Sequence, residues 1–472
     1  MSDVIIGGYL LPHPPVIVPE VGKGRENDAA LTLKAYQQVS LEAKQLAPDT
    51  VIIISPHAPL FSDYVFMYDS PLLSGSFANF DAPNAKLSFE QDSDLRQEIE
   101  RAMHKAGIPG GTLSASEKAR FDIKDELDHG VLVPLYYFSK LYKDFKIVAM
   151  SCSGLDMQQL YNLGKLLRAC AEKLSRKTVI LASGDMSHKV NRESPYGMRP
   201  EGAEFDRQVS EFISASDIPS ILSIDSGLRE KAAECGYRSL VILCGAFDKI
   251  KPECELLSYE APFGIGYCVA RFSPSETSAP SAFEQAYKKV PRENENPYVN
   301  IARKSLEAYV QSGTEISSSQ FRNIPNAKDL FEKRAGVFVS LKKFGELRGC
   351  IGTTAPTQDN IAEEIIENAI SAGTRDPRFN PVRPDELDFL EYSVDVLSEA
   401  VPAKISELDP KTYGVIVRKG SRSGLLLPDL EGVDTVEQQL EIACRKAGIN
   451  PRENYDIYKF TVTRYKGNSK EG

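Results

Sequence analysis

The segment Thr178-Val-Ile-Leu-Ala-Ser183 constrains the fold more than any other stretch of the chain. It is a continuous apolar run without polar alternation, which is typical of a strand buried on both faces of an α/β sheet. A tight polar turn, Gly184-Asp185-Met186-Ser187-His188, follows it directly. Ligands of open α/β sheets bind at the carboxyl ends of the strands. The pattern therefore predicts that His188 lies at a ligand-binding edge, although a lone histidine after a strand is more often a loop or core residue.

Two further histidines follow apolar strands in the same way. The apolar run at residues 4–11 stops at Pro12-His13-Pro14-Pro15, and the strand at residues 51–54 ends in Ser55-Pro56-His57-Ala58-Pro59. Proline ends regular structure and stiffens the loop that carries each histidine. We expect both side chains to converge on one point at the sheet edge. The alternative is that these proline-flanked histidines merely terminate strands.

The remaining polar candidates of this half are His129, after Asp128 in a loop, and Glu260, next to the closing strand at residues 264–272. Two histidines and one carboxylate can occupy one face of an octahedral iron(II) and leave three positions for substrate and dioxygen. A further histidine outside this set could move protons, because its pKa lies near neutral pH. A single glutamate before a strand is also common without a functional role. His104 lies on a charged helical face, and we expect it at the surface.

A chain of 472 residues is long enough for two or three domains. Alternating strands and helices over residues 1–272 predict an α/β sandwich with a mainly buried central sheet flanked by helices. By composition, residues 273–296 are a linker and residues 466–472 a disordered tail. The pattern of residues 297–465 predicts a second domain of the α+β class.

Composition excludes several classes of function. The chain is 42% hydrophobic and 26% charged, as in soluble globular proteins, and no run approaches the length of a membrane span. The N-terminus lacks the features of a signal peptide, so we expect a cytoplasmic protein without a membrane partner. A net charge of −10 argues against a nucleic-acid partner. The 8 cysteines show no zinc-type spacing and are expected to be reduced thiols.

The second domain offers two weaker candidate sites. Cys350 lies in a glycine-bounded segment two residues after Arg348, and an arginine can lower the pKa of a nearby thiol and make it a nucleophile. A purely structural role of this segment is an equal alternative. Arg375 and Asp376, with Arg378, could form an anion-binding loop or an ordinary surface cluster of ion pairs. This domain contains no histidine, so a Cys-His pair within it is excluded.

Residues 5–272 resemble the catalytic subunit of class III extradiol ring-cleaving dioxygenases, to which the Memo proteins are also related. The matching pieces occur in the same order over most of the domain. They are Leu11-Pro-His13-Pro-Pro, Ser55-Pro-His57-Ala-Pro, Asp128-His129-Gly, Ser183-Gly-Asp-Met-Ser-His188, the stretch from Tyr196-Gly to Glu204-Phe-Asp206, and Glu260 before Gly264-Ile-Gly-Tyr267.

This resemblance implies a set of roles. His13, His57 and Glu260 would bind iron(II), or another divalent metal, and His188 would be the acid–base residue. His129 would lie near the substrate outside the ligand set. The substrate would be an aromatic catechol or 2-aminophenol, cleaved with dioxygen. Further candidates from the same motifs are Asp128, Asp185 and Tyr196.

Residues 297–465 resemble the AMMECR domain, through Leu347-Arg-Gly-Cys350-Ile-Gly, Asp376-Pro-Arg-Phe379, Gly424-Leu-Leu-Leu-Pro428 and Cys444-Arg-Lys-Ala-Gly448. A chain with both halves resembles the protein A family of AmmeMemoRadiSam systems, which implies a separate radical S-adenosylmethionine enzyme as partner. The alternative function is therefore a Memo-like metal-binding partner or scaffold that does not cleave rings. A third hypothesis is that both domains modify a non-aromatic substrate. The resemblance also makes a homodimer an expectation, because a second subunit often closes the pocket in such dioxygenases.

Overall fold

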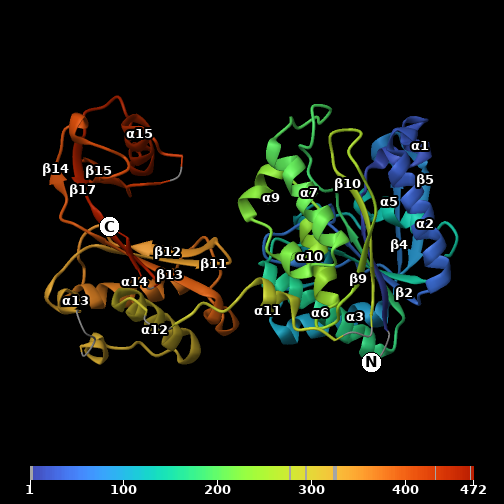
Figure 1. The fold of residues 1–472 in the computed structure, drawn as a ribbon, viewed down its shortest axis with the longest axis horizontal. Helices are drawn as coiled ribbons and strands as arrows, with labels where there is room; N and C mark the ends of the chain where they lie inside the picture. Colours follow the sequence, from blue (N-terminus) through green and yellow to red (C-terminus); the bar gives the residue numbers. More distant parts are fainter. Residues whose placement is uncertain are drawn as a thin grey trace. The chain divides into compact units, whose positions relative to one another are not determined.

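The chain folds into two compact units, Met1–Tyr287 and Lys288–Gly472 (Figure 1). The computed structural model describes residues 4–275, 278–292, 295–322, 327–430, 432–467 and 469–471. The first unit is an α/β domain with a mixed central sheet, and the second combines antiparallel sheets with helices. Both fold-class predictions are confirmed.

A six-stranded sheet with the order β7-β2-β8-β1-β10-β9 forms the centre of the first unit. The first four strands in this order are parallel, and the last two pair antiparallel at one edge. The carboxyl ends of the parallel strands therefore share one edge, where the loops that follow β1, β2 and β8 meet. The bounds are β1 (Ile5–Leu11), β2 (Thr50–Ser55), β7 (Lys146–Ser151), β8 (Thr178–Ser183), β9 (Glu253–Glu260) and β10 (Tyr267–Ser273).

Two adjacent glycines in β1 let helices approach the sheet from both faces. A Cβ atom on Gly7 would lie 3.2 Å from Leu46 of α2 (Ala30–Leu46), and one on Gly8 would lie 2.5 Å from Leu243 of α10 (Tyr237–Ala246). Successive strand residues point to opposite faces, so these two helices cover opposite faces of the sheet. Helix α5 (His129–Phe138) packs beside α2, and α6 (Met157–Leu174) packs beside α10.

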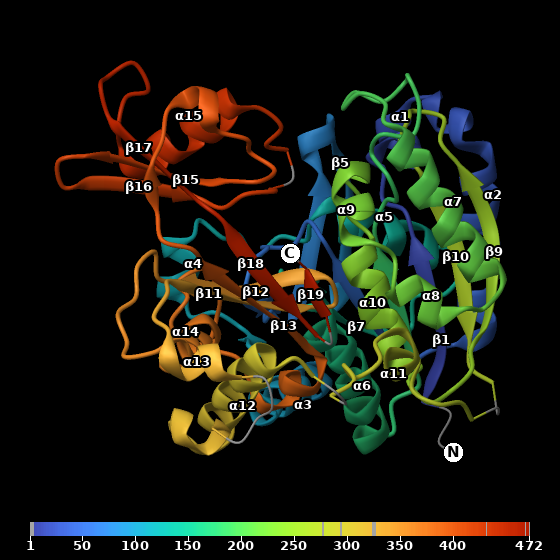
Figure 2. The same ribbon diagram turned by 60° about the vertical axis from the view of Figure 1, so that its left-hand side comes forward.

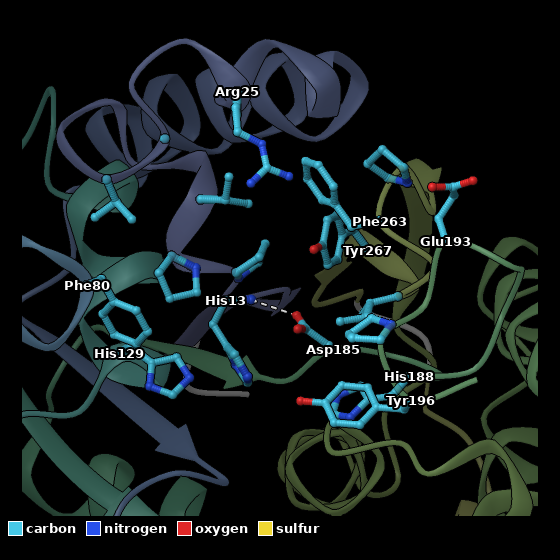
Figure 3. A pocket seen from close by; sticks show the side chains of 18 of the residues that line it. His13, Arg25, Phe80, His129, Asp185, His188, Glu193, Tyr196, Phe263 and Tyr267 are labelled. Atoms are coloured by element: carbon cyan, nitrogen blue, oxygen red, sulfur yellow. Dashed lines mark hydrogen bonds between the residues drawn. The ribbon is translucent and has the colours of Figure 1, made fainter. Parts of the chain in front are cut away.

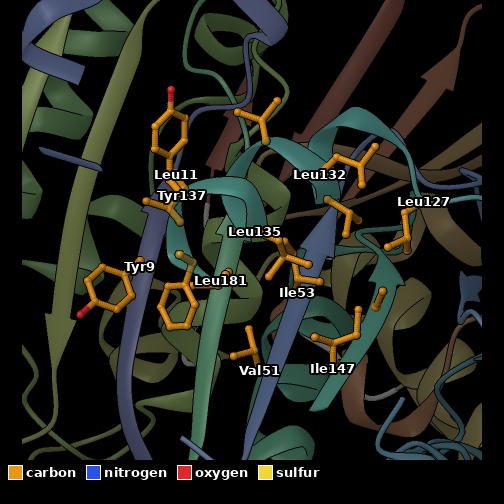
Figure 4. Packing of buried hydrophobic residues seen from close by; sticks show 14 of the residues in the cluster. Tyr9, Leu11, Val51, Ile53, Leu127, Leu132, Leu135, Tyr137, Ile147 and Leu181 are labelled. Atoms are coloured by element: carbon orange, nitrogen blue, oxygen red, sulfur yellow. The ribbon is translucent and has the colours of Figure 1, made fainter. Parts of the chain in front are cut away.

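Alternate residues of the parallel strands form the core beneath α5 (Figure 4). Leu132 and Leu135 of that helix lie over these strand side chains, and both are buried. A fully buried aliphatic or aromatic side chain stabilises a fold by roughly 1.5–3 kcal/mol, so this layer holds the strand ends firmly. The strand residues of the layer include Tyr9, Leu11, Val51, Ile53, Ile147 and Leu181.

Shorter elements complete the first unit. Helix α11 lies within the predicted linker, where its Phe283 ring packs 5.2 Å from the ring of Tyr161. The bounds are η1 (Pro15–Ile17), α1 (Pro19–Gly22), η2 (Arg25–Ala29), β3 (Val65–Phe66), β4 (Leu72–Phe77), η3 (Ala78–Phe80), β5 (Ala82–Glu90), α3 (Ser93–Ala106), β6 (Gly110–Gly111), α4 (Ala115–Arg120), α7 (Pro200–Ser214), α8 (Ile218–Leu222), α9 (Ser226–Ala232) and α11 (Ala282–Ala286).

The second unit contains a sheet of order β12-β11-β13-β18-β19, packed against α14, and a smaller sheet β14-β17-β15-β16, packed against α15 (Figure 2). The tail at residues 466–472 was expected to be disordered, but it contains the short strand β19, whose backbone pairs with β18. Residues 468 and 472 lie outside the described residues. The bounds are α12 (Pro297–Ser312), η4 (Ser318–Phe321), α13 (Lys328–Glu332), β11 (Val337–Lys343), β12 (Glu346–Gly352), α14 (Ile361–Thr374), η5 (Pro384–Phe389), β13 (Leu390–Leu397), β14 (Val401–Pro402), η6 (Ile405–Glu407), β15 (Gly414–Lys419), β16 (Arg422–Leu426), α15 (Val436–Ala447), β17 (Asp456–Phe460), β18 (Val462–Lys466) and β19 (Ser469–Glu471).

Within the described part of the chain, no helix combines the length and the hydropathy needed to cross a bilayer.

Candidate metal centre

Three side chains from different loops bring one ligand atom each to a common point. The donor atoms of His13, His57 and Cys235 all lie within 4.8 Å of one another. The Nε2 atom of His13 is 3.0 Å from Nε2 of His57 and 3.7 Å from Sγ of Cys235. One cation could contact all three, because metal–nitrogen and metal–sulfur bonds measure about 2.0–2.3 Å. The arrangement is a possible His/His/Cys metal site.

A hydrogen-bond chain determines which nitrogen of His13 is free for a metal. The hydroxyl of Ser183, at the end of β8, donates to the carbonyl oxygen of Gly130 over 2.5 Å. Since its proton is used there, the same hydroxyl accepts from Nδ1–H of His13 over 2.9 Å. His13 therefore presents the lone pair of Nε2 to the common point. A hydrogen bond of this kind fixes the orientation of a metal-binding imidazole.

His57 is placed by the helix that starts beside it. Asp128 caps α5 by accepting from the backbone N–H of Gly130 over 2.8 Å, and it also accepts from the Ser55 hydroxyl over 2.6 Å. The Ser55 hydroxyl oxygen accepts in turn from the backbone N–H of His57 over 3.1 Å. Asp128 thus links the end of β2 to the start of α5, the helix that begins at His129.

Cys235 reaches the site through a close contact between two glycines. A Cβ atom on Gly184 would lie 2.0 Å from Cα of Gly236, a distance that no side chain tolerates. This approach brings the loop before α10 against the turn after β8, where the backbone N–H of Asp185 lies 3.3 Å from Sγ of Cys235. Burial raises the pKa of the Cys235 thiol well above its ordinary value. A bound cation would favour the thiolate.

His13 and His57, two of the three donors, form part of the wall of a pocket with a volume of about 640 Å³, shown in Figure 3. The carboxylate of Asp185 accepts from the backbone N–H of His13 over 2.9 Å, and burial raises the pKa of this carboxyl to about 7. Apolar and aromatic side chains, among them Val16, Phe80 and Phe263, provide much of the remaining wall. Pockets of this size and composition accommodate small organic ligands.

Two more histidines, His129 and His188, line the same pocket. The ring of His129 lies 4.2 Å from that of His57, and the ring of His188 stacks on Tyr196 at 5.4 Å. Burial lowers the pKa of His129 and of His188 to about 4, and it also lowers the pKa of His13 and His57. All four imidazoles are therefore mainly neutral at pH 7. Tyr196 is 62% exposed and forms part of the rim.

Glu260, predicted as the third ligand, lies elsewhere. Its Oε1 atom accepts from the backbone N–H of Thr32 over 2.6 Å, in the first turn of α2. A carboxylate at this place satisfies a free amide and the positive end of the helix dipole. Glu260 belongs neither to the donor group nor to the pocket wall, and the structure brings Cys235 to His13 and His57 in its place.

Cys235 is the candidate ligand that the pattern of the sequence did not reveal. Its thiol is among those expected to be reduced, because the 8 cysteines show no zinc-type spacing. A signal was present in Cys235-Gly236 directly before the helix that begins at Tyr237, since a glycine there permits close backbone approach. The partner in that approach, Gly184, is distant in sequence.

In the second unit, Cys350 is half-buried on β12, and its sulfur accepts from the Ser340 hydroxyl over 3.2 Å. The guanidinium of Arg348 is directed to Glu386 and not to this thiol, because it forms two 3.0 Å hydrogen bonds with the Glu386 carboxylate. Burial opposes ionisation of Glu386, but Arg348 and Lys343 outweigh it and lower the pKa of this carboxyl to about 2. Arg348 therefore belongs to a buried ion-pair network.

The predicted loop at residues 375–378 is held by ion pairs. Asp376 accepts from Arg378 over 2.7 Å and from the backbone N–H of Cys350 over 2.9 Å, and the Arg378 bond lowers the pKa of Asp376 to about 2. Arg375 pairs with Glu367 over 2.7 Å. Of the two alternatives for this loop, the geometry favours the ion-pair cluster. Its carboxylate anchors the backbone at Cys350.

The sheet with histidines at its carboxyl edge defines the class of protein. Residues 7–270 match the family described as the catalytic LigB subunit of aromatic ring-opening dioxygenase, and the chain belongs to that family. Residues 299–469 match the AMMECR1 family. The chain is thus a fusion of a LigB domain with an AMMECR1 domain.

Similar proteins cover the whole chain or part of it. A protein of Clostridium acetobutylicum is 42% identical over 467 residues, which are 98% of this chain and 99% of that protein. A Thermotoga maritima protein is 57% identical over 175 residues, 36% of this chain and 98% of its own length. Among solved structures, an uncharacterized protein of Escherichia coli K12 is 14% identical with a TM-score of 0.36, and the alignment covers 56% of this chain and 99% of that one.

Proposed function

We propose that the first unit is a metal-dependent ring-cleaving dioxygenase that acts on a catechol or 2-aminophenol type of substrate. One observation carries the proposal: two of the three donors, His13 and His57, line the same pocket as two further neutral histidines, His129 and His188. The pocket volume of about 640 Å³ suits a single substituted aromatic ring. The family of the first unit agrees with this chemistry.

Iron(II) is the metal that we propose for the site. Two imidazoles and one thiolate would hold it at His13, His57 and Cys235 and leave positions for two adjacent heteroatoms of the substrate and for dioxygen. Bound iron(II) would supply Lewis acidity toward the substrate and electrons toward dioxygen. The thiolate also suits copper(I) and zinc.

His188 is the residue that we propose as acid and base. Its lowered pKa of about 4 leaves the imidazole neutral at pH 7, so that it can accept a proton from a substrate hydroxyl. Its backbone is held at both ends, because its N–H donates to the Ala232 carbonyl over 3.1 Å and its carbonyl accepts from the Ser194 hydroxyl. The Tyr196 ring orients the imidazole by stacking. His129, packed against His57 and Phe80, is a positioning residue for the His57 ring.

The test is oxygen uptake with a panel of catechols and 2-aminophenols on iron-loaded protein. We expect His188→Ala to retain its iron and to lose roughly 10²- to 10⁴-fold in turnover, the usual contribution of acid–base catalysis. His104→Ala is the matched control, because His104 is an exposed histidine at the end of α3. Equal turnover of the two variants would exclude the role of His188.

A second candidate function is supported by the thiol at the third position. Cys235 replaces the carboxylate of the expected ligand set, which favours a metal-binding partner or scaffold that works with a separate radical S-adenosylmethionine enzyme. The AMMECR1 unit would then recruit that enzyme. Stoichiometric metal without oxygen uptake on any substrate of the panel would favour this function over ring cleavage. A homodimer and a cytoplasmic location are further proposals of the same kind.

A further inference from the structure

The turn that carries His188 is bound by three other segments of the first unit. The Ser187 carbonyl accepts from the backbone N–H of Gly266 over 2.8 Å, and the N–H of His188 donates to the Ala232 carbonyl over 3.1 Å. The amide of Ser187 has a partner of a different kind, because its N–H donates to the side-chain carboxylate of Asp206 over 2.7 Å. Asp206 belongs to α7 and comes before His188 in space, although it follows it in the chain.

Asp206 is a buried carboxylate inside a helix. It is 1% exposed, and its second oxygen accepts from the Tyr259 hydroxyl over 2.7 Å. Aspartate is a poor residue for a helix interior, and burial of its charge is unfavourable, so that burial raises the pKa of this carboxyl to about 7. No lysine or arginine of the described residues pairs with it. The hydrogen bonds to Ser187 and Tyr259 are what offset the cost of placing an acid here.

Close backbone packing connects Asp206 to the turn without slack. A Cβ atom on Gly266 would lie 1.9 Å from Oδ2 of Asp206, and one on Gly202 in α7 would lie 2.6 Å from Oγ of Ser187. Both glycines thus permit contacts that no other residue would allow. Since Ser187 directly precedes His188, a displacement at Asp206 reaches the imidazole through a single residue of fixed backbone.

We propose that Asp206 is a positioning residue for His188, whose imidazole it fixes at the pocket wall by binding the Ser187 amide. The inference rests on the proposed function, because it takes His188 as the acid and base. Asp206 itself does not line the pocket. It acts through the hydrogen bond and not through its charge, since the pKa of His188 is lowered by burial, His57 and Lys189 and not by Asp206.

Three variants separate the hydrogen bond from packing and from charge. Asp206→Ala removes the acceptor, and Asp206→Leu removes it while filling the same space. Asp206→Asn removes the charge but keeps an oxygen for the Ser187 amide and offers an N–H to the Tyr259 hydroxyl oxygen. Asp248→Ala is the matched control, because Asp248 is 2% exposed and also accepts from a tyrosine hydroxyl, that of Tyr161, over 2.8 Å, but does not line the pocket.

The first measurement is nitrogen NMR of the full-length zinc(II)-loaded protein with isotopically labelled histidine. The chain contains 5 histidines, and His188→Ala assigns the signal of His188. Burial lowers the pKa of His188 to about 4. An imidazole that leaves its place becomes more hydrated, so in Asp206→Ala and Asp206→Leu we expect its pKa to rise toward the ordinary value of about 6.5. Asp206→Asn and Asp248→Ala should keep the wild-type value.

The second measurement is turnover of the iron-loaded protein with the catechol and 2-aminophenol panel. A displacement of about 1 Å can cost roughly 100-fold in rate. We therefore expect Asp206→Ala and Asp206→Leu to lose roughly 10- to 100-fold in kcat with little change in KM. Asp206→Asn and Asp248→Ala should stay near the wild type.

The NMR measurement decides the proposal without relying on turnover. An unchanged pKa of His188 in folded Asp206→Leu, or an equal rise in Asp206→Asn or Asp248→Ala, would overturn the positioning role. A rise confined to Asp206→Ala and Asp206→Leu supports it. If that rise is found in a protein that turns over no substrate of the panel, Asp206 positions His188 as proposed and the ring-cleaving function is contradicted.

Discussion

At the scale of single residues, the hydrogen-bond partner of one ring nitrogen of His13 determines which nitrogen is free to bind a metal. Ser183 uses its proton on Gly130 and so leaves Nδ1 of His13 as the donor and Nε2 as the free nitrogen. The sequence could predict that His13 and His57 share an edge, since both follow buried strands. It could not predict the tautomer, because the partner of His13 lies 170 positions away.

Replacing Ser183 by alanine should weaken metal binding. Without the hydroxyl, Nδ1 of His13 loses its acceptor, and the ring can present either nitrogen to the site. The expected loss of metal affinity is roughly 10- to 100-fold, as for other residues that orient metal ligands. Competition with a chromophoric chelator measures this directly.

Ser151→Ala is the matched control for this experiment. Ser151 is a buried serine at the end of β7, two strands from β8 in the same sheet, and its hydroxyl oxygen accepts from the backbone N–H of Phe66 over 2.9 Å. Equal metal affinities of Ser183→Ala and Ser151→Ala would show that the Ser183 hydrogen bond does not orient a ligand.

At the scale of elements, the candidate metal site lies where the carboxyl ends of β1, β2 and β8 approach the start of α10. Sequence patterns locate β1, β2 and β8 well, because their apolar runs and the prolines or glycine after them are local signals. The start of α10 joins them only through the contact of Gly184 with Gly236, which has no local signature. Glu260 is a ligand by the family resemblance, whereas in the structure its carboxylate accepts from the backbone N–H of Thr32 in the first turn of α2.

Widening the glycine contact should displace the thiol. A methyl group on Gly184 would lie 2.0 Å from Cα of Gly236, so Gly184→Ala must push the loop of Cys235 outward. Overpacking of this kind costs about 1–3 kcal/mol, and we expect a loss of metal affinity of at least roughly tenfold. Calorimetric titration of the metal into both proteins is the measurement.

Gly227→Ala in α9 is the control, because a Cβ atom there would meet only Asp225 Oδ1, at 3.2 Å. Unchanged metal affinity in Gly184→Ala would contradict the account of how Cys235 is positioned.

At the scale of the whole molecule, two compact units correspond to two families. The boundary between the compact units lies at residues 287 and 288. The change of composition at residue 273 marks where β10 ends, but it does not reveal that Phe283 is 5% exposed and packs on α6. A single aromatic residue in a polar segment is a weak signal of docking. The sequence also did not reveal the ion pair of Arg348 with Glu386. Cys350 lies closer to Arg348 in the sequence and was therefore the expected partner.

Truncation should therefore be sensitive to where the chain is cut. A protein of residues 1–287 keeps Phe283 and the hydrogen bond from the Tyr287 hydroxyl to the Leu222 carbonyl, whereas one of residues 1–272 loses both. We expect the shorter protein to be less stable by about 2 kcal/mol, the value of one buried aromatic side chain. Urea denaturation of both metal-free proteins tests this. Equal stabilities would show that α11 contributes nothing to the first unit.

The central claim is that His13, His57 and Cys235 together hold a metal, and the cobalt(II)-loaded protein tests it most directly. Cobalt bound to a thiolate shows a sulfur-to-metal charge-transfer band. We predict that band in the wild type and in Glu260→Gln. The control Cys254→Ala, which removes a thiol outside the donor group, should also show it. Cys235→Ala should lose both the band and most of the bound cobalt. A Cys235→Ala protein that keeps its cobalt, together with a Glu260→Gln protein that loses it, would contradict the claim and assign the third position to the carboxylate.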